Sequence, residues 1–134
     1  MTAPITIQPV LTKDFEEISR IECAAFYADP LSLALFGPDR ASPESITIRA
    51  AAFEKESSKA SSRMTKAVTA DGVIVGVAVW GFYPQGRPEE EWNKESEWPE
   101  GANVALCRAW SGASKGLMKK IIDGKHFARE LSFC

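Results

Sequence analysis

The sequence has few of the residues on which metal and disulfide chemistry depend. It contains one histidine, His126, and three cysteines, Cys23, Cys107 and Cys134, which are widely spaced and form no C-x-x-C pair. An odd number of scattered cysteines with a single histidine argues against a structural zinc site and against a disulfide framework. We therefore expect no bound metal and reduced, mostly buried thiols.

Long apolar runs and an excess of one charge are also missing. No basic stretch followed by an apolar run opens the chain, and nowhere do the ~18 consecutive apolar residues of a membrane span occur. The formal net charge of -2 provides no basic field that would attract nucleic acid or an anionic membrane. We expect an intracellular, cytoplasmic protein that has neither nucleic acid nor a membrane as a partner.

What is present suits one globular domain over residues 1–134. A chain of 134 residues with 45% hydrophobic and 10% aromatic residues can bury one modest core. Residues 5–10 alternate apolar and polar side chains, which predicts a first strand with Pro9 near its end. A helix should follow it, because Asp14 and Glu17 have capping-box spacing and an apolar stripe comes next, at Phe15, Ile18, Ile21, Glu22, Ala25 and Phe26.

Two further helices are predicted before residue 60. Asp29-Pro30 ends the first helix, and Leu31 to Phe36 form a short apolar one. Ser42-Pro43-Glu44 is a typical helix start, with a capping hydroxyl, a first-turn proline and an acid near the positive end of the helix dipole. Its predicted inner residues are Ile46, Ala50 and Phe53.

From Met64 to Tyr83 the pattern indicates two strands joined at Asp71-Gly72, a strong hairpin signal because both turn residues tolerate positive φ. The second strand is apolar at both parities and should be covered on both faces, so we expect an interior strand with helices nearby. Gly76 suggests a bulge or a close backbone approach within it. Together with the first strand this predicts a largely antiparallel sheet.

The last third predicts a loop, a helix and a strand. Residues 83–101 carry six glutamates and three prolines and are expected to form a long surface loop. Asn103 to Ile122 follow as a helix closed by Asp123-Gly124, with a set of apolar inner positions: Val104, Cys107, Trp110, Leu117 and Ile121. Phe127 to Cys134 then begin a fourth strand. The order of about four helices among these strands favours the α+β class.

This order and its residues resemble the small-molecule-type GNAT (GCN5-related) N-acetyltransferases common in fungi. The matching stretches are the first strand at Ile5 to Pro9, Ala24-Ala25-Phe26 with Asp29-Pro30-Leu31, the strand Ile74 to Trp80, and Gly124-Lys125-His126-Phe127. They cover nearly the whole chain but only about the N-terminal half of the family's domain. The resemblance implies a partial GNAT fold and, in the family, acetyl transfer from acetyl-CoA to a small-molecule amine.

One family motif is absent. In the family the fourth strand leads to a Q/R-x-x-G-x-G/A loop at a helix start, whose N–H groups bind the pyrophosphate of acetyl-CoA. The only comparable stretch, Ser111 to Gly116, lies upstream and inside a helical pattern, so we do not interpret it as a phosphate loop. We expect a chain that does not bind acetyl-CoA alone and is inactive alone, with no cofactor-binding or catalytic residue assigned.

The resemblance also suggests where an acceptor substrate could lie. Phe26, Tyr27 and Asp29 between the first helices, and Trp80, Phe82 and Tyr83 at the end of the hairpin, correspond to regions that can face the acceptor in the family. The alternative is that the aromatic rings complete a core and that Asp29 forms a helix-ending turn.

Two further features have a functional and a plain interpretation. His126 is a candidate general base by its ordinary pKa, but no partner is placed beside it, so we favour a loop or strand-start histidine. The basic residues of the last third could meet a nucleotide phosphate, the acidic loop at Glu89 to Glu91, or solvent, and we favour solvent. They are Lys115, Lys119, Lys120, Lys125 and Arg129.

Three hypotheses follow from the sequence. The first is an acetyltransferase of the GNAT superfamily that needs the missing half for activity. The second is a non-catalytic binding or assembly module that forms a homodimer or pairs with another chain through its open sheet edge. The third is an unrelated α+β domain, which a hairpin that does not pair with the first strand would indicate.

Overall fold

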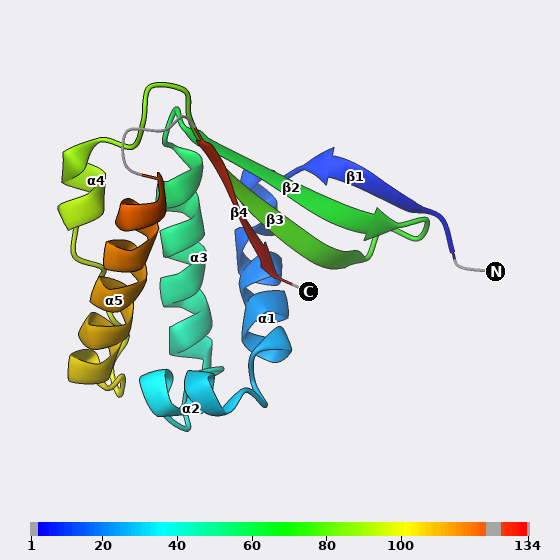
Figure 1. The fold of residues 1–134 in the computed structure, drawn as a ribbon. Coiled ribbons are helices and arrows are strands. Elements are labelled where there is room, and N and C mark those ends of the chain that lie inside the picture. The colour runs from blue at the N-terminus through cyan, green and yellow to red at the C-terminus, as the bar shows by residue number, and fades with distance from the viewer. Residues whose placement is uncertain (1–2, 123–126, 134) are drawn as a thin grey trace.

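The computed structural model describes residues 3–122 and 127–133. Within these ranges four strands and four of the five α-helices follow one another in the order that the sequence predicts, and the fifth, the short helix α4, is additional (Figure 1). Their bounds are β1 Ile5–Pro9, the 3-10 turn Thr12–Asp14, α1 Phe15–Ala25, α2 Pro30–Phe36, α3 Pro43–Ser57, β2 Ser62–Thr69, β3 Ile74–Tyr83, α4 Glu89–Asn93, α5 Val104–Ile122 and β4 Phe127–Phe133. The predicted α+β class is confirmed.

The strands form one antiparallel sheet in the order β1-β2-β3-β4. The β2–β3 hairpin pairs with β1, with Ile5 opposite Thr69 and Pro9 opposite Thr65. This pairing is the one that the GNAT resemblance requires, and it removes the ground for the third hypothesis.

A bulge interrupts the β2–β3 ladder, as the glycine in the strand predicted. Ala67 lies opposite Gly76 and Val68 lies opposite Ile74, so Val75 is an extra residue on β3. The turn at the hairpin tip differs in detail from the prediction, because only Gly72 has a positive φ, at 86°, and no non-glycine residue in the described part of the chain does.

The core lies between one face of the sheet and the helices α1 and α3, which pack against each other. Ile18 is fully buried, and Phe15, Phe53, Val77 and Val79 surround it, each less than 9% exposed. Helix α3 begins as predicted, with Pro43 in its first turn and the Ser42 Oγ accepting a hydrogen bond from the Ser45 N–H at 3.2 Å.

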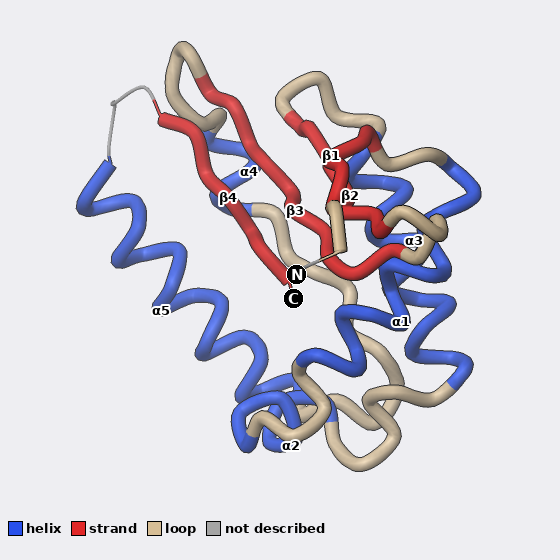
Figure 2. Tube along the Cα trace, turned by 90° about the vertical axis from the view of Figure 1, so that its right-hand side faces the viewer, coloured by secondary structure: helices blue, strands red, loops and turns tan. Residues whose placement is uncertain are grey.

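The opposite face of the sheet does not have the cover that the apolar pattern of β3 predicted. Val75 and Phe82 are both 44% exposed. Figure 2 shows α1 and α3 together on one side of the strands, with α5 set apart beyond β4. Apolar residues at both ends of β3 on this second face are thus open to solvent, while Trp80 between them is half-buried.

A buried ion pair replaces the capping box predicted at the start of α1. Asp14 does not cap the helix with its side chain. Its Oδ2 accepts instead from the Leu11 N–H at 2.7 Å and from the Lys66 Nζ at 2.6 Å, and the two charged side chains are 7% and 8% exposed. The pair fastens the start of α1 to β2.

Helix α5 follows its predicted range but not its predicted burial. Only Cys107 is buried, at 1% exposed, while Val104, Trp110, Leu117 and Ile121 are 37%, 53%, 63% and 61% exposed. The prediction of an inner apolar face was therefore wrong for four of the five positions. The reason is that, among the described elements, α5 packs mainly on the short helix α2 rather than on the sheet.

The 83–101 segment, predicted as a loop, contains the helix α4, and Trp92 on it is buried. The Tyr83 hydroxyl donates to the Glu91 Oε2 at 2.6 Å, and the Arg87 guanidinium lies 4.7 Å from the centroid of the Trp92 ring. These contacts fasten α4 to the end of β3. No helix in the described residues is both long enough and apolar enough to cross a membrane.

Candidate functional site

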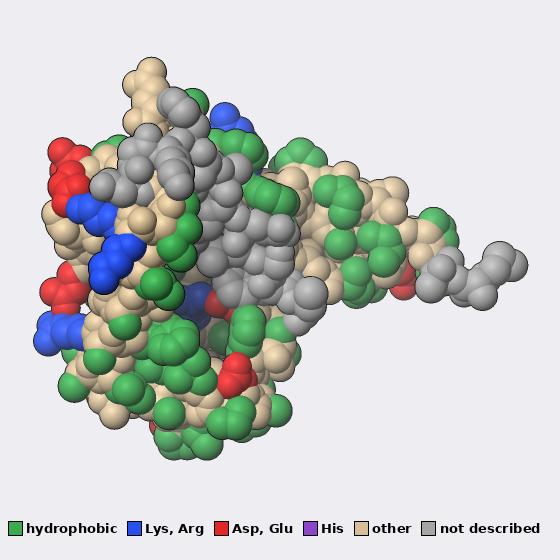
Figure 3. Space-filling model, in the orientation of Figure 1, with side chains coloured by type: hydrophobic (Ala, Val, Ile, Leu, Met, Phe, Trp, Pro, Cys, Tyr) green, Lys and Arg blue, Asp and Glu red, His purple; other side chains and the backbone are tan. Residues whose placement is uncertain are grey.

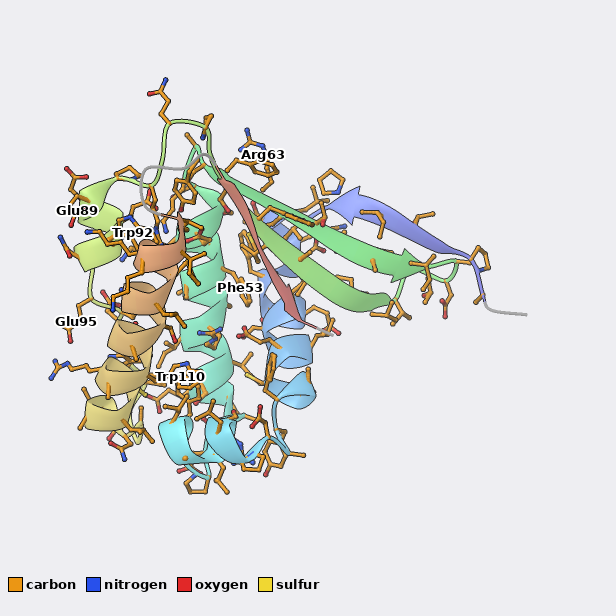
Figure 4. The ribbon with its side chains drawn as sticks, viewed as in Figure 1. Phe53, Arg63, Glu89, Trp92, Glu95 and Trp110 are labelled. Atoms are coloured by element: carbon orange, nitrogen blue, oxygen red, sulfur yellow. The ribbon has the colours of Figure 1, made fainter. Side chains whose placement is uncertain are left out.

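A cavity of about 350 Å³ lies at the end of the molecule where α1, α2, α3 and α5 approach one another. Four aromatic rings line it: Phe26 after α1, Phe36 at the end of α2, Trp98 before α5, and Trp110 on α5. Figure 4 shows Trp110 on the side of α5 that faces α2 and α3. Figure 3 shows the surface at this end of the molecule dominated by hydrophobic side chains.

Glu22 is the buried carboxylate of this wall, which also holds Asp29 and the cations Arg40 and Arg49. It lies on α1 one turn after Ile18, at a position that the helical pattern places inward, and it is 7% exposed. The Arg49 guanidinium on α3 binds it with two groups: Nε donates to Oε2 at 3.2 Å, and NH2 donates to Oε1.

Burial raises the pKa of Glu22, although the charge and the hydrogen bonds of Arg49 act in the opposite direction. Arg49 itself is less enclosed, with 39% of its side chain exposed. The carboxylate is thus fixed in the wall, whereas its partner has a path to solvent.

The two cysteines at the cavity are thiols rather than thiolates. Burial raises the pKa of Cys23, and the neighbouring Glu22 carboxylate raises it further. Burial also raises the pKa of Cys107. Since the thiolate is the nucleophile, neither residue is arranged for nucleophilic catalysis.

Cys107 instead helps to position α5 over the cavity. Its Sγ donates to the Leu35 carbonyl at 3.4 Å, and the same carbonyl accepts from the Asn103 N–H at 2.8 Å. Gly37 makes this approach possible, because its φ is 76° and a Cβ there would lie 3.1 Å from the Gly101 carbonyl oxygen.

The predicted residues between the first two helices have different positions. Phe26 and Asp29 line the cavity. The Asp29 N–H donates to the Phe26 carbonyl at 3.1 Å in the turn after α1, which is the plain interpretation that the sequence left open. The Asp29 Oδ1 also accepts from the Leu31 N–H at 2.8 Å and caps α2. Tyr27 does not line the cavity. The Arg40 guanidinium donates to the Tyr27 carbonyl and lies 4.1 Å from the centroid of the Tyr27 ring.

The predicted residues at the end of β3 lie elsewhere and do not line the cavity. The Trp80 and Phe82 rings stack on the open face of the sheet, with their centroids 6.5 Å apart. Tyr83 is buried on the other face, where its hydroxyl binds Glu91. The structure thus joins Phe26 and Asp29 in one site and keeps the strand-end aromatics apart from it.

Sequence reasoning missed the residues that give the cavity its charge and its far wall. Glu22 offered a signal, because a charged residue occupied an inward position of an apolar helical stripe. Arg49, Trp98 and Trp110 offered none, since their nearness to Glu22 depends on how α3 and α5 pack.

The basic residues of α5 contact acidic residues of the α4 region. Lys119 Nζ binds Glu89 Oε1 at 2.6 Å, and Arg108 Nε binds Glu95 Oε1 at 2.5 Å. The interpretation that these cations meet the acidic segment is confirmed for Lys119, in place of the solvated face that we favoured. Figure 4 shows Glu89 and Glu95 along the outer side of this segment.

No described helix starts on the Q/R-x-x-G-x-G/A loop that the family uses for the pyrophosphate of acetyl-CoA. One N–H at the start of α2, one at the start of α3 and one at the start of α5 are bound by Asp29, Ser42 and Asn103, and α1 and α4 carry glutamates in their first turns. The stretch 111–116 lies inside α5, as expected. Each described α-helix start therefore already presents a side-chain oxygen or carboxylates where an anion would bind. His126, with Lys125 and the predicted helix end at Asp123-Gly124, lies outside the described residues, as does Cys134.

No protein-family model and no curated protein matches the chain. The fold is similar to that of a solved structure, a histone acetyltransferase HPA2 and related acetyltransferase from Corynebacterium glutamicum. The TM-score is 0.50 at 23% sequence identity, and the match covers 90% of this chain and 71% of that one. The chain has a GNAT-type fold. The GNAT resemblance derived from the sequence is confirmed at the level of the fold.

Proposed function

We propose that the cavity of this GNAT-type domain binds a primary amine on an apolar body, the acceptor of an acetyl transfer. We propose further that the chain alone does not bind acetyl-CoA and is inactive alone, as the N-terminal part of an acetyltransferase domain would be. The observation that carries the first proposal is the Glu22 carboxylate, which is 7% exposed at the wall of a cavity that four aromatic rings line.

A cationic ligand suits this arrangement. A buried carboxylate needs a charged partner, and the one that it has, Arg49, can turn to solvent along its exposed side. An incoming ammonium would take the place of the guanidinium on Glu22. The faces of Phe26, Trp98 and Trp110 would then pack on the apolar body and attract the positive charge.

The same carboxylate could also receive a proton. Acetyl transfer in the family is a direct attack by the amine, which must lose a proton, and a carboxylate with a raised pKa is a better proton acceptor than an ordinary one. Asp29 and Phe26 would orient the amine beside Glu22. For Tyr27, Trp80, Phe82 and Tyr83 the substrate role stays a prediction from the resemblance.

Calorimetric titration with phenethylamine and with its neutral counterpart phenethyl alcohol tests the proposal. The amine should bind, and Glu22→Gln should weaken it by about tenfold or more, the value of one charged hydrogen bond. The alcohol should bind equally weakly to both proteins. Glu16→Gln, an exposed change on the same helix, is the matched control and should leave amine binding unaltered.

Two results would count against this function. Equal affinity of wild type and Glu22→Gln for phenethylamine would remove Glu22 from the site. Heat from acetyl-CoA titrated into the chain would overturn the second part of the proposal, because it would show that the chain binds the donor without the family's pyrophosphate loop.

A second candidate function is the non-catalytic assembly module. One observation favours it: β4 pairs with β3 on one side, and no described strand pairs with its other side. An open edge of this kind can add a strand from another chain. Absence of amine and acetyl-CoA binding, together with a complex in sedimentation, would support this candidate over the first.

A further inference from the structure

The sheet has a second open edge, on β1, and it lies on an arm that extends away from the helices (Figure 1). The arm consists of residues 5–9, 66–69 and 73–76. All five residues of β1 are exposed, with Ile5 at 55% and Ile7 at 69%. No described strand or helix pairs with the outer side of β1.

The backbone groups on that outer side can be assigned from the ladder. The Val10 N–H donates to the Met64 carbonyl at 3.1 Å, and hydrogen-bonded pairs alternate along an antiparallel ladder. Gln8 and Thr6 therefore direct their N–H and C=O groups toward β2. Ile5 and Ile7 direct theirs outward.

The side chains of Ile5 and Ile7 lie on the open face of the sheet. Gln8 is opposite Lys66, whose side chain points to the helices and binds Asp14, so the odd residues of β1 point to the other face. The outer edge thus presents two outward N–H groups, two outward carbonyls and two exposed isoleucines within three residues.

Charge does not protect this edge. Edge strands of monomeric proteins commonly carry charged residues that prevent pairing, yet residues 1–12 contain no Asp, Glu, Lys or Arg. Figure 3 shows the arm with hydrophobic and other uncharged side chains over most of its visible surface. Two copies can therefore approach along β1 without repulsion between like charges.

We propose that two copies of the chain pair antiparallel through β1 and join their sheets into one. Ile5 of one copy then lies opposite Ile7 of the other, and each such pair exchanges two N–H···O=C bonds, four in all. Sliding the strands by two residues in one direction would place Pro9, which has no N–H, opposite Ile5 of the other copy. Sliding them in the other direction would place Ala3, which lies outside the strand, opposite Ile7.

The shape of the molecule permits this pairing. The helices follow the Pro9 end of β1, so an antiparallel arrangement places the two helical bodies at opposite ends of the joined arms (Figure 1). Because only one short strand from each copy contributes, the contact belongs to the small, weak class of interfaces below about 1,200 Å². We expect a dimer that dissociates at roughly micromolar concentration.

Sedimentation equilibrium with Ile7→Pro tests the outward hydrogen bonds directly. Proline removes an N–H that the β1–β2 ladder does not use, and proline is tolerated on an edge strand, as Pro9 already shows. The dissociation constant should rise by about tenfold or more, while Ile7→Val, which keeps the N–H, should dimerise like the wild type. Circular dichroism verifies that each variant folds.

A cysteine cross-link gives an independent measurement should Ile7→Pro fail to fold. The two-fold axis passes through Thr6, so Thr6→Cys places two thiols in a directly opposed, non-hydrogen-bonded pair about 4.5 Å apart at Cα, within disulfide range. Gln8→Cys is the matched control, because in the dimer the two copies of residue 8 are offset by four residues along the paired strands, about 13 Å. Oxidation should link Thr6→Cys into a dimer and leave Gln8→Cys monomeric.

Three outcomes would overturn the proposal. They are a wild-type chain that stays monomeric to hundreds of micromolar, a folded Ile7→Pro variant that dimerises like the wild type, and equal cross-linking of the two cysteine variants. A dimer that survives Ile7→Pro would indicate the β4 edge instead. None of these results bears on amine binding, so this inference and the proposed function can fail separately.

Discussion

Replacing Asp14 with asparagine should destabilise the fold by about 3–5 kcal/mol, because it leaves the Lys66 ammonium buried without a counter-charge. The two side chains are 7% and 8% exposed, so solvent screens the pair little. Asparagine keeps an oxygen for the Leu11 N–H, and the loss therefore reports mainly on the missing charge. Urea unfolding followed by tryptophan fluorescence measures the free energy of unfolding.

The double variant Asp14→Leu/Lys66→Met separates the pair from its surroundings. Removing both charges relieves their desolvation, so the double variant should be far closer to wild type than Asp14→Asn is. Glu17→Gln, an exposed change on the same helix, should stay within about 0.5 kcal/mol of wild type. Asp14→Asn with a loss below about 1 kcal/mol would refute the reasoning, since it would mean that Lys66 finds water or another partner at no cost.

Three further predictions concern pH, backbone strain and α4. The pKa of Glu22 is raised in the fold, so wild type should lose stability relative to Glu22→Gln as the pH rises above about 4.3. Urea unfolding at several pH values measures this difference in stability, and a difference that stays constant with pH would contradict the prediction. Gly72→Ala should lower the free energy of unfolding by about 1–2 kcal/mol because the φ of Gly72 is positive. Gly37→Ala should lower it more, since the new Cβ at residue 37 would also meet a carbonyl oxygen. Equal losses of melting temperature in the two variants would refute this. Tyr83→Phe should cost about 1 kcal/mol and speed amide exchange in α4, and unchanged exchange would separate α4 from that hydroxyl.

The sequence predicted the elements that local chemistry determines. The start of α3 follows from a serine and a proline in fixed positions, and the hairpin follows from Asp71-Gly72, so both are encoded within a few residues. The carboxylate of Asp14 shows where such reasoning fails. Its local signal indicated a helix cap, but Lys66, which is 52 residues away in the chain, binds it in the fold.

The cavity was less accessible to prediction than the fold because its walls come from segments far apart in the chain. Phe26 and Asp29 were found through a family resemblance, whereas Trp110 was assigned to an inner helix face on which only Cys107 is buried. The inward position of Glu22 was visible in the sequence, but its meaning depended on Arg49 from another helix. A charged residue inside an apolar helical stripe therefore predicts that a partner or a ligand must face it, and only the packing of α1 against α3 identifies which one does.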